Sequence, residues 1–420
     1  MDLTRRHLLG GLGGLAASAA VGRAAQPGAA PSGPVPTPAP QGAGVPLPRK
    51  TDFAILEGMT YINGAYIHPV SVASAENVRR YAQSRLHPDG PAKWDRLDIK
   101  AEFAALINAK PSEIAFVPNT TTGENLIFNG LDIVGTGGNV VTDALHFEGA
   151  LIHLQALAKD GLDLRIVMPR DWQIQLSDLE KVVDRKTRLV ELSHVAMFTG
   201  FQHDLKAVCD LAHANGALVY ADIAQSAGCT PIDVKACNVD FCACSSFKWL
   251  MGDFGLGFLY AREDLLDRVI RRSQYGYYQA AKMATHFLPY DDPGKGPLSF
   301  ELRPDATGHF EVGSQASGAW AALSMSLPYI RTLGVEKIEA YRQPMLQRLQ
   351  KEMPRLGFEP LTPAGSRSAL VSFGTRDAMA YAERLKKAGI NVRLSRHFIR
   401  LSPSVYNDMA DIERFLEAVS

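Results

Sequence analysis

Short apolar runs alternate with segments of helical periodicity through the middle of the chain. The apolar runs have the length of β-strands and occupy residues 114–117, 139–142, 164–168, 188–195, 217–221 and 239–244. Apolar residues at helical spacing separate several of them, for example over residues 176–183 and 205–215. Because strands and helices alternate from residue 114 to residue 260, the pattern predicts an α/β fold with a mostly parallel, doubly wound sheet.

Longer helical patterns flank this central part. Two precede it, at residues 70–86 and 94–109, and two follow it, at residues 314–333 and 335–356. The last part of the chain mixes short strands with helices, which predicts a small α+β domain. Its strands are expected at residues 369–373, 391–394 and 398–401, and its helices at residues 378–388 and 408–419.

These patterns predict two folded domains. The expected large domain covers residues 70–315, and the connecting helices with the small C-terminal domain cover residues 316–420. Residues 50–69 contain a short strand followed by a loop at 60–66, and we expect this N-terminal segment to pack with the small domain.

One long segment, residues 273–309, shows no clear periodicity. It is polar and aromatic, and its notable side chains are Tyr275, Tyr277, Tyr278, His286 and Tyr290. Segments of this length without regular structure are commonly functional or mobile. We therefore expect a loop that shapes the substrate pocket.

The N-terminus has the pattern of an export signal. Arg5 and Arg6 precede a short Gly/Ala/Leu run at residues 10–21, which is too short to span a membrane. The arginine pair makes residues 1–25 similar to a twin-arginine signal peptide, whose export machinery carries folded proteins. Residues 26–49 are rich in Pro, Ala and Gly and predict an extended linker. The expected mature protein is periplasmic with no stable membrane span. The alternative is a basic amphipathic start or a retained anchor, which would leave the protein cytoplasmic or membrane-attached.

Composition narrows the possible partners. The 44 basic and 44 acidic residues balance, so nothing indicates a nucleic-acid partner. The five cysteines fall in one region, mostly on or beside predicted buried strands, and no CxxC pair is present. We therefore expect buried small hydrophobic residues, with neither disulfides nor a metal site.

An acid and a lysine occupy the ends of two predicted strands. Asp222 ends the run at 217–221, and Lys248 follows the run at 239–244. Ligands of open α/β sheets bind outside the carboxyl ends of the strands, so both side chains are expected in one crevice. Singly, the aspartate is explained as a turn or helix cap and the lysine as a solvated side chain. The apolar neighbours of Lys248, among them Phe247 and Trp249, argue against a solvated loop.

Such a pair suits pyridoxal phosphate chemistry. The lysine amine forms a Schiff base with the aldehyde, and the carboxylate keeps the pyridine nitrogen protonated. Asp222-x-x-Gln225, then Ser245-x-x-Lys248, then a glycine-rich strand at 252–260 resemble the class V aminotransferase family. These fold-type I enzymes include cysteine desulfurases, selenocysteine lyases, kynureninase and isopenicillin N epimerase, and the resemblance runs from about Phe53 to the C-terminus.

The resemblance implies a role for several more residues in holding the cofactor. Thr121 and Thr122, at a strand-to-helix turn, would bind the phosphate, and Ser245 would add a hydroxyl. An ordinary threonine N-cap is the alternative for that turn. His146 would stack on the pyridine ring, with Phe147 as the second choice.

The phenolic oxygen of the cofactor has fewer expected contacts here than in relatives. Many of them have an asparagine near the position of Met197, and a methionine cannot donate that hydrogen bond. Gln225 would make the contact alone. This departure bears on the reaction type more than on the fold.

The same resemblance implies the substrate and subunit contacts. Arg400, in Arg-Leu-Ser-Pro-Ser-Val-Tyr-Asn, matches the arginine that holds the substrate α-carboxylate, and a guanidinium suits that role. Asn63 lies in an N-terminal loop that reaches the substrate in relatives. Ser314 matches a phosphate contact from the neighbouring subunit, which implies a homodimer with a shared active site.

The expected activity is that of a pyridoxal phosphate enzyme acting on an amino acid or amino-acid-derived compound. Lys248 would form the aldimine and then remove the α-proton, in a transaminase or epimerase type of reaction similar to isopenicillin N epimerase. A C–S lyase similar to cysteine desulfurase or selenocysteine lyase is the alternative, but residues 393–398 lack the mobile cysteine of desulfurases. A non-catalytic binding protein is a third possibility, which the presence of both Lys248 and Asp222 disfavours.

Overall fold

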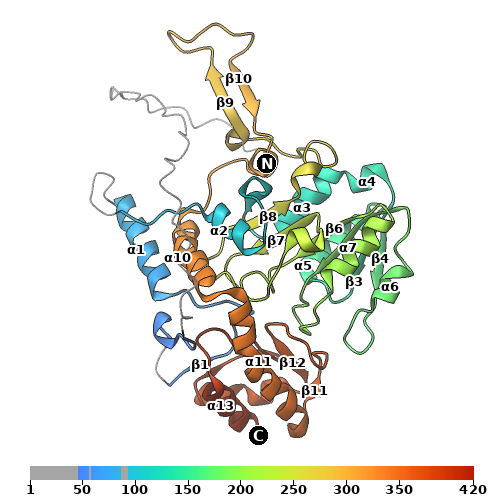
Figure 1. Cartoon of the computed structure of the whole chain (residues 1–420), viewed down its shortest axis with the longest axis vertical. Helices are drawn as coiled ribbons and strands as arrows, with labels where there is room; N and C mark the ends of the chain where they lie inside the picture. Colours follow the sequence, from blue (N-terminus) through green and yellow to red (C-terminus); the bar gives the residue numbers. More distant parts are fainter. Residues whose placement is uncertain (1–45, 56–57, 87–92) are drawn as a thin grey trace, which may run out of the picture. The chain divides into compact units, whose positions relative to one another are not determined.

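A computed structural model describes residues 46–55, 58–86 and 93–420. The expected signal at 1–25 and most of the linker expected at 26–49 lie outside these residues. Residues 45–420 form one compact unit, shown in Figure 1. None of the helices in the described ranges combines the length and the apolar composition needed to cross a bilayer.

The centre of the fold is a seven-stranded sheet with the strand order β2-β8-β7-β6-β5-β3-β4. Its strands are β2 (Ile114–Val117), β3 (Asn139–Asp143), β4 (Asp163–Val167), β5 (Thr187–Ser193), β6 (Leu218–Asp222), β7 (Phe241–Ser245) and β8 (Gly257–Ala261). Neighbours are parallel except around β8, which is antiparallel to both β2 and β7. This arrangement confirms the predicted α/β fold with a mostly parallel sheet.

Helices cover both faces of the sheet, which explains why its strands are almost continuously apolar. Successive strand residues point to opposite faces, so Leu189 and Val190 of β5 belong to different hydrophobic clusters. One cluster includes side chains of α3 (Thr120–Leu131) and α5 (Glu148–Lys159). The other includes side chains of α2 (Ile99–Leu106), α7 (Leu205–Ala214) and α10 (Ser317–Leu333).

Further helices complete the described chain. The α-helices are α1 (Val72–Leu86), α4 (Ile133–Thr136), α6 (Leu176–Glu180), α8 (Val234–Cys237), α9 (Ala306–Phe310) and α11 (Val335–Glu352). Short 3-10 helices occupy Lys50–Asp52, Pro111–Glu113, Glu263–Leu265, Tyr277–Gln279, Met353–Leu356 and Ala378–Tyr381. The helix expected at 94–109 is shorter, because Asp98 caps its start by accepting from the backbone N–H groups of Lys100 and Ala101.

The C-terminal part contains a four-stranded sheet with the order β11-β12-β15-β14. Its strands are β11 (Glu359–Pro360), β12 (Val371–Gly374), β14 (Arg393–Ser395) and β15 (Phe398–Leu401), and its helices are α12 (Ala382–Lys387) and α13 (Met409–Val419). The N-terminal strand β1 (Thr60–Tyr61) pairs in parallel with β13 (Ile390–Asn391). Ile62 joins the hydrophobic core of this region.

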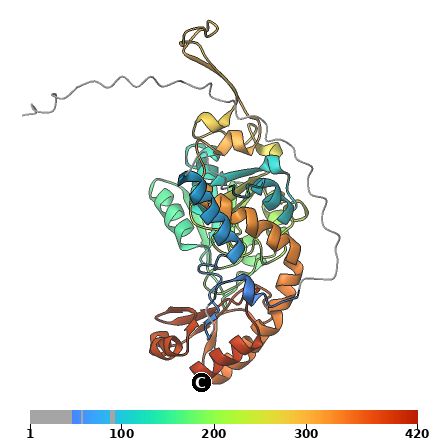
Figure 2. The ribbon, with the colours of Figure 1, turned by 90° about the vertical axis from the view of Figure 1, so that its left-hand side faces the viewer.

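The segment 273–309, expected as a loop, contains an antiparallel hairpin of β9 (Ala280–Thr285) and β10 (Leu298–Leu302). Figures 1 and 2 show the hairpin projecting from the ribbon around it. Its exposed large hydrophobic side chains are Met283, Phe287, Leu288, Tyr290, Leu298 and Phe300. The sequence did not predict this hairpin. Its strands do not bury one face, so apolar and polar residues do not alternate along them.

Candidate active site

Asp222 and Lys248 lie at the carboxyl ends of neighbouring strands. Asp222 is the last residue of β6 and pairs in register with Ala243 of β7, which ends at Ser245. Lys248 follows three residues later. The Asp222 carboxylate is buried, and its Oδ1 accepts a 2.8 Å hydrogen bond from the backbone N–H of Ala224. The chain therefore places the acid and the amine at one edge of the sheet, as the sequence predicts.

Hydrogen bonds hold together the two ends of the chain segment that carries Lys248. The connection from β7 to the antiparallel β8 spans residues 246–256. The Ser246 hydroxyl lies 2.6 Å from the carbonyl oxygens of both Asp253 and Leu256. Within the connection, the N–H of Met251, whose φ is +56°, donates to the Lys248 carbonyl at 2.9 Å. The lysine backbone is therefore held by hydrogen bonds on both sides.

The amino group of Lys248 has an environment that favours its neutral, nucleophilic form. Burial lowers its pKa, the nearby Asp222 charge opposes that effect, and the Arg400 charge adds to it. Nζ lies 5.9 Å from the ring centroid of Phe147 and 5.8 Å from that of Phe247. Within the described ranges, no carboxylate forms an ion pair with Nζ, so the amine is available to a carbonyl compound.

The start of α3 faces the end of β7. The helix is capped by Asn119, whose Oδ1 accepts from the Thr122 N–H at 2.8 Å and from the Thr122 hydroxyl at 3.1 Å. The Thr120 N–H donates to Ser245 Oγ at 3.2 Å. The Thr121 hydroxyl forms no hydrogen bond with any described residue. Because the cap is Asn119, the helix start leaves this hydroxyl available for an anion such as a phosphate.

His146 follows the carboxyl end of β3 by three residues, within electrostatic range of Asp222. Its Nδ1 is 2.8 Å from Ser193 Oγ, and its Nε2 is 3.5 Å from Glu191 Oε1. Burial lowers the pKa of His146, which keeps the ring neutral, while the Asp222 charge acts in the opposite direction. The side chain of His146 has no exposed area, whereas Phe147 is half-buried with its ring toward Lys248. The assignment of the stacking residue to His146 remains a prediction.

A buried acidic pair next to His146 was missed by the sequence reasoning. Glu191, in the middle of β5, has both carboxyl oxygens buried without a hydrogen-bond partner in the described chain. Burial raises its pKa to about 8. On α3, burial and then the Glu191 charge raise the pKa of Glu124 to about 7, and its Oε1 lies 2.5 Å from His153 Nδ1. The only available signal was a glutamate inside an apolar strand.

The side-chain amide of Gln225 is mostly engaged within the protein. Its Nε2 donates to the Ala65 carbonyl at 3.0 Å, and its Oε1 accepts from the Trp249 indole N–H at 3.0 Å. A primary amide has two N–H groups, so one donor remains for a ligand. Met197 contributes its backbone carbonyl to the site, where it accepts from Arg400.

Arg400 reaches this site from β15 of the C-terminal sheet. Its Nη1 donates to the Met197 carbonyl at 2.9 Å, and its buried Nε has no hydrogen-bond partner in the described chain. Burial and the neighbouring Arg393 lower its pKa to about 10, so it stays positively charged at neutral pH. The Arg400 charge also lowers the pKa of Lys248, so the guanidinium lies within electrostatic range of the amine.

The remaining predicted residues take different places. Asn63 is buried, pairs with Ser402 in a parallel bridge, and donates from Nδ2 to Asn391 Oδ1 at 3.0 Å. Ser314 is exposed, and its Oγ lies 2.9 Å from the Tyr277 hydroxyl. In the described part of the chain, no hydrogen bond joins Ser314 to Lys248, and the role of Ser314 stays a prediction.

The cysteines are unsuited to sulfur transfer. Cys209, Cys229, Cys242 and Cys244 are buried, Cys237 is partly buried, and all five are free. Burial raises the pKa of the Cys229 thiol to about 11 and that of Cys244 further. A nucleophilic thiolate is therefore disfavoured at these positions. The described residues also contain no cluster of metal-ligating side chains.

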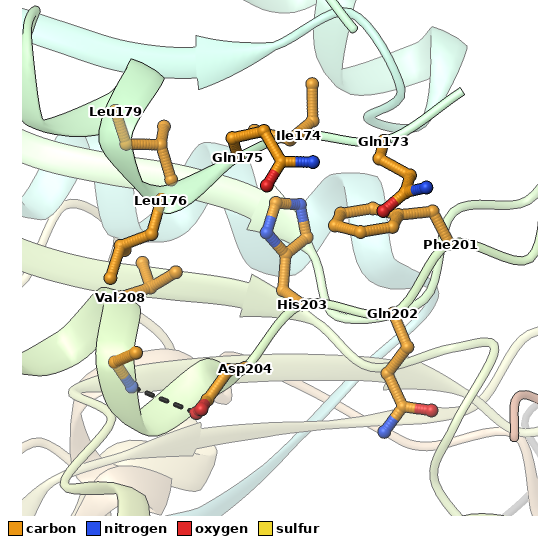
Figure 3. Close-up of a pocket in the computed structure, with 11 residues that line it drawn as sticks. Gln173, Ile174, Gln175, Leu176, Leu179, Phe201, Gln202, His203, Asp204 and Val208 are labelled. Carbon is orange, nitrogen blue, oxygen red and sulfur yellow. Dashed lines mark hydrogen bonds between the residues drawn. The ribbon is translucent and has the colours of Figure 1, made fainter. Parts of the chain in front are cut away.

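A cavity of about 180 Å³ lies apart from these residues, between α6 and α7. Figure 3 shows His203 at its centre, near Phe201 and Gln175. The His203 Nε2 atom lies 3.1 Å from Asp143 Oδ2, so the ring is held by the end of β3. None of the side chains predicted to bind cofactor or substrate lines this cavity.

Comparisons with known proteins agree with the geometry. The family model for aminotransferase class-V matches residues 74–415. A cysteine desulfurase of Shigella flexneri is 27% identical over 344 residues, covering 76% of this chain and 80% of the relative. The apo structure of a cysteine desulfurase from Thermococcus onnurineus NA1 superposes with a TM-score of 0.75 at 24% identity, covering 89% of this chain and 98% of that one. The cystine C–S lyase C-DES, in complex with its product cysteine persulfide, gives a TM-score of 0.72 at 22% identity, covering 87% and 98%.

The fold and the site define a fold-type I, pyridoxal phosphate-dependent enzyme. The chain belongs to the class V aminotransferase family. The site fits this cofactor because it combines a lysine amine that forms no ion pair with any described residue, a buried carboxylate, and a helix start with a hydroxyl that no described residue engages. Membership in an enzyme family sets aside the non-catalytic alternative.

Proposed function

We propose that this enzyme removes the α-proton of an amino acid or amino-acid-derived substrate and catalyses transamination or epimerisation. The observation that supports the proposal is that the buried Arg400 guanidinium, held by the Met197 carbonyl, lies within electrostatic range of the Lys248 amine. A carboxylate on the guanidinium of Arg400 would place the α-carbon of an amino acid near Nζ of Lys248. Removal of the α-proton, the step that both reactions share, needs these groups and the cofactor.

Each side chain would have one task. Bound pyridoxal phosphate acts as an electron sink that stabilises the charge left on the α-carbon. Lys248 would hold the cofactor through its amine. Once that amine is released, its Nζ would carry the α-proton. Asp222 would hold a proton on the ring nitrogen. Thr121, Thr122 and Ser245 would bind the phosphate, and Gln225 would donate its remaining N–H to the phenolic oxygen.

A desulfurase that carries sulfur on its own cysteine is disfavoured. In the C-terminal sheet, β14 and β15 are joined by the two-residue turn Arg396–His397, and neither strand nor turn contains a cysteine. The thiols elsewhere are buried with raised pKa values. Formation of an enzyme persulfide needs an accessible thiolate, which these positions do not supply.

A C–S lyase without an enzyme persulfide is the second candidate. It is supported by the similarity to cysteine desulfurases and to a cystine C–S lyase. Elimination of a sulfur leaving group begins with the same removal of the α-proton, so Lys248 and Arg400 would serve it equally.

The test begins with protein from residue 26 onward, reconstituted with pyridoxal phosphate. We expect a visible absorption band that Lys248→Ala abolishes and that the exposed control Lys351→Ala retains. Amino acids are then screened for three products: the opposite enantiomer for epimerisation, an oxo acid that requires an amino acceptor for transamination, and pyruvate with ammonia and a released thiol or sulfide for elimination. A wild type that takes up no cofactor would refute the proposal.

We further propose a homodimer in which Ser314 contacts the cofactor phosphate of the other subunit. Support comes from the exposure of Ser314 and from the exposed hydrophobic side chains of the β9–β10 hairpin, since such clusters are typical of interaction surfaces. Light scattering should give twice the chain mass. Replacing Phe287, Leu288 and Phe300 by serine should weaken the dimer, and a wild-type monomer that binds the cofactor fully would contradict this proposal.

We also propose export to the periplasm through the N-terminal arginine pair. The support is the sequence alone, because residues 1–25 lie outside the described structure. Fractionation of cells should find wild-type protein in the periplasm, and Arg5→Lys with Arg6→Lys should retain it in the cytoplasm. Equal distribution of both proteins would argue against this route.

A further inference from the structure

Two arginines face each other on the hairpin that carries Arg400. Strands β14 and β15 are antiparallel, and Arg393 pairs directly with Arg400. Directly paired residues place their side chains side by side on one face, where like charges repel. The Arg393 charge is the second cause, after burial, of the lowered pKa of Arg400. The hairpin therefore concentrates positive charge at one place.

No anion of the described chain neutralises this charge. Arg400 donates to the neutral Met197 carbonyl, and its Nε has no hydrogen-bond partner among the described residues. The guanidinium of Arg393 lies over the ring of Tyr66, 4.9 Å from the centroid. Neither arginine forms an ion pair in the described ranges. Placing two uncompensated cations together costs stability, and that cost is offset when an anion binds both.

The two arginines differ in their surroundings: Arg400 is near the Lys248 amine, and Arg393 is nearer to solvent. Arg400 is 3% exposed, and its charge lowers the pKa of Lys248. Arg393 is more exposed than Arg400, and its partner Tyr66 is 46% exposed. Arg400 therefore lies on the amine side of the pair and Arg393 on the solvent side. A substrate whose α-carboxylate binds Arg400 would meet Arg393 with another part of its structure.

We propose that the substrate carries a second acidic group, which Arg393 binds while Arg400 binds the α-carboxylate. This inference rests on the proposed function for the role of Arg400. A planar guanidinium pairs with a carboxylate through two parallel hydrogen bonds, so each arginine suits one acidic group. The competing arrangement places a single carboxylate between both arginines, and it predicts no preference for substrates with two acidic groups.

Binding of small acids tests the inference without relying on turnover. The probes are succinate and glutarate, each compared with its monoamide, which has nearly the same shape and one fewer charge. Calorimetry on the wild-type holoenzyme should show each diacid binding about tenfold more tightly than its monoamide, since a charge-assisted hydrogen-bonded pair is worth about that factor. Arg393→Gln should remove the preference, Arg393→Lys should keep part of it, and Arg396→Gln, in the exposed turn of the same hairpin, should keep all of it.

Amino acids extend the comparison to the complete site. Aspartate against asparagine, and glutamate against glutamine, should perturb the visible band of the wild type with the same preference for the acid. Equal binding of acids and monoamides, or an Arg393→Gln variant that weakens both to the same extent, would overturn the inference. Failure of the proposed function has a different signature, because Arg400→Gln would then leave the binding of every probe unchanged.

Discussion

At the scale of single residues, the buried carboxyl of Glu191 has an unusually high pKa. Its Oε1 lies 3.5 Å from His146 Nε2, and neither carboxyl oxygen has a hydrogen-bond partner in the described chain. Burial raises its pKa to about 8; the His153 charge opposes this effect and the Asp222 charge adds to it. Glu191 is therefore mostly protonated at pH 7, because an unpaired buried carboxylate is costly.

This state gives a pH-dependent prediction for stability. The folded pKa of Glu191 lies above the unfolded value of about 4.5, so between pH 4.5 and 8 the native state binds more protons and its stability falls as pH rises. Glu191→Gln removes that loss. The free energy of unfolding of Glu191→Gln relative to that of wild type should therefore increase from pH 5 to pH 8, by on the order of 3 kcal/mol. Urea unfolding at both pH values measures this. The exposed control Glu180→Gln should show no such trend, and a pH-independent difference for Glu191→Gln would contradict the prediction.

Arg400 gives a kinetic prediction. Replacing it by glutamine should lower kcat/KM for the amino-acid substrate by about 100-fold or more, because the α-carboxylate loses a charge-assisted, two-point contact. Arg400→Lys should recover only part of this, since an ammonium cannot make both bonds. Steady-state kinetics on the identified substrate provides the measurement. Full activity of Arg400→Gln would show that the carboxylate binds elsewhere.

The sequence was sufficient to place Asp222, Lys248 and Arg400, because each lies at a strand end or on a short strand with a distinctive motif. It was insufficient for Glu191 and Arg393. The environment of Glu191 depends on α3 and α5, which lie far from it in the chain. Arg393 pairs with Arg400 only because the turn has two residues, whereas the predicted strands left three residues between them and so did not establish the register.

At the scale of elements, the start of α3 separates two roles that the sequence assigned together. Asn119 caps the helix and engages Thr122, while the Thr121 hydroxyl has no partner among the described residues. Thr121→Val should therefore weaken pyridoxal phosphate binding about tenfold or more, the value of one hydrogen bond to a charged group. Thr122→Val should have a smaller effect. Equilibrium dialysis measures both, and a larger loss for Thr122→Val would contradict this division.

The elements themselves were predictable where burial imposes a pattern. All strands of the central sheet lie within a few residues of their expected positions. Apolar runs mark most of them because both of their faces are covered, whereas β4, at the end of the sheet, is only partly buried. The β9–β10 hairpin has little buried surface and was expected as a loop. The start of α2 was misplaced because the cap of Asp98, a local hydrogen-bonding effect, outweighs the helical pattern before it.

At the scale of the whole molecule, the N-terminal segment packs against later parts of the chain. Phe53 is 2% exposed, and its ring packs edge-on against His68, Tyr329 and Tyr406 at centroid distances of 5.6, 6.2 and 5.1 Å. Phe53→Ala should lower the free energy of unfolding by about 3–5 kcal/mol, the usual cost of truncating a buried phenylalanine. Thermal unfolding measures this, with the exposed Ile152→Ala as the control. An unchanged Tm would show that this cluster contributes little.

The closed connection around Lys248 has a kinetic consequence. Because residues 246–256 are hydrogen bonded at their base, the motion of the amine is limited mainly to rotations about its own side-chain bonds. An amine restricted in this way acts at a high effective concentration toward any carbonyl or α-carbon held beside it, since little freedom remains to be lost when they react. Free amines added to a Lys248→Ala enzyme should therefore restore activity only at concentrations far above that of the protein.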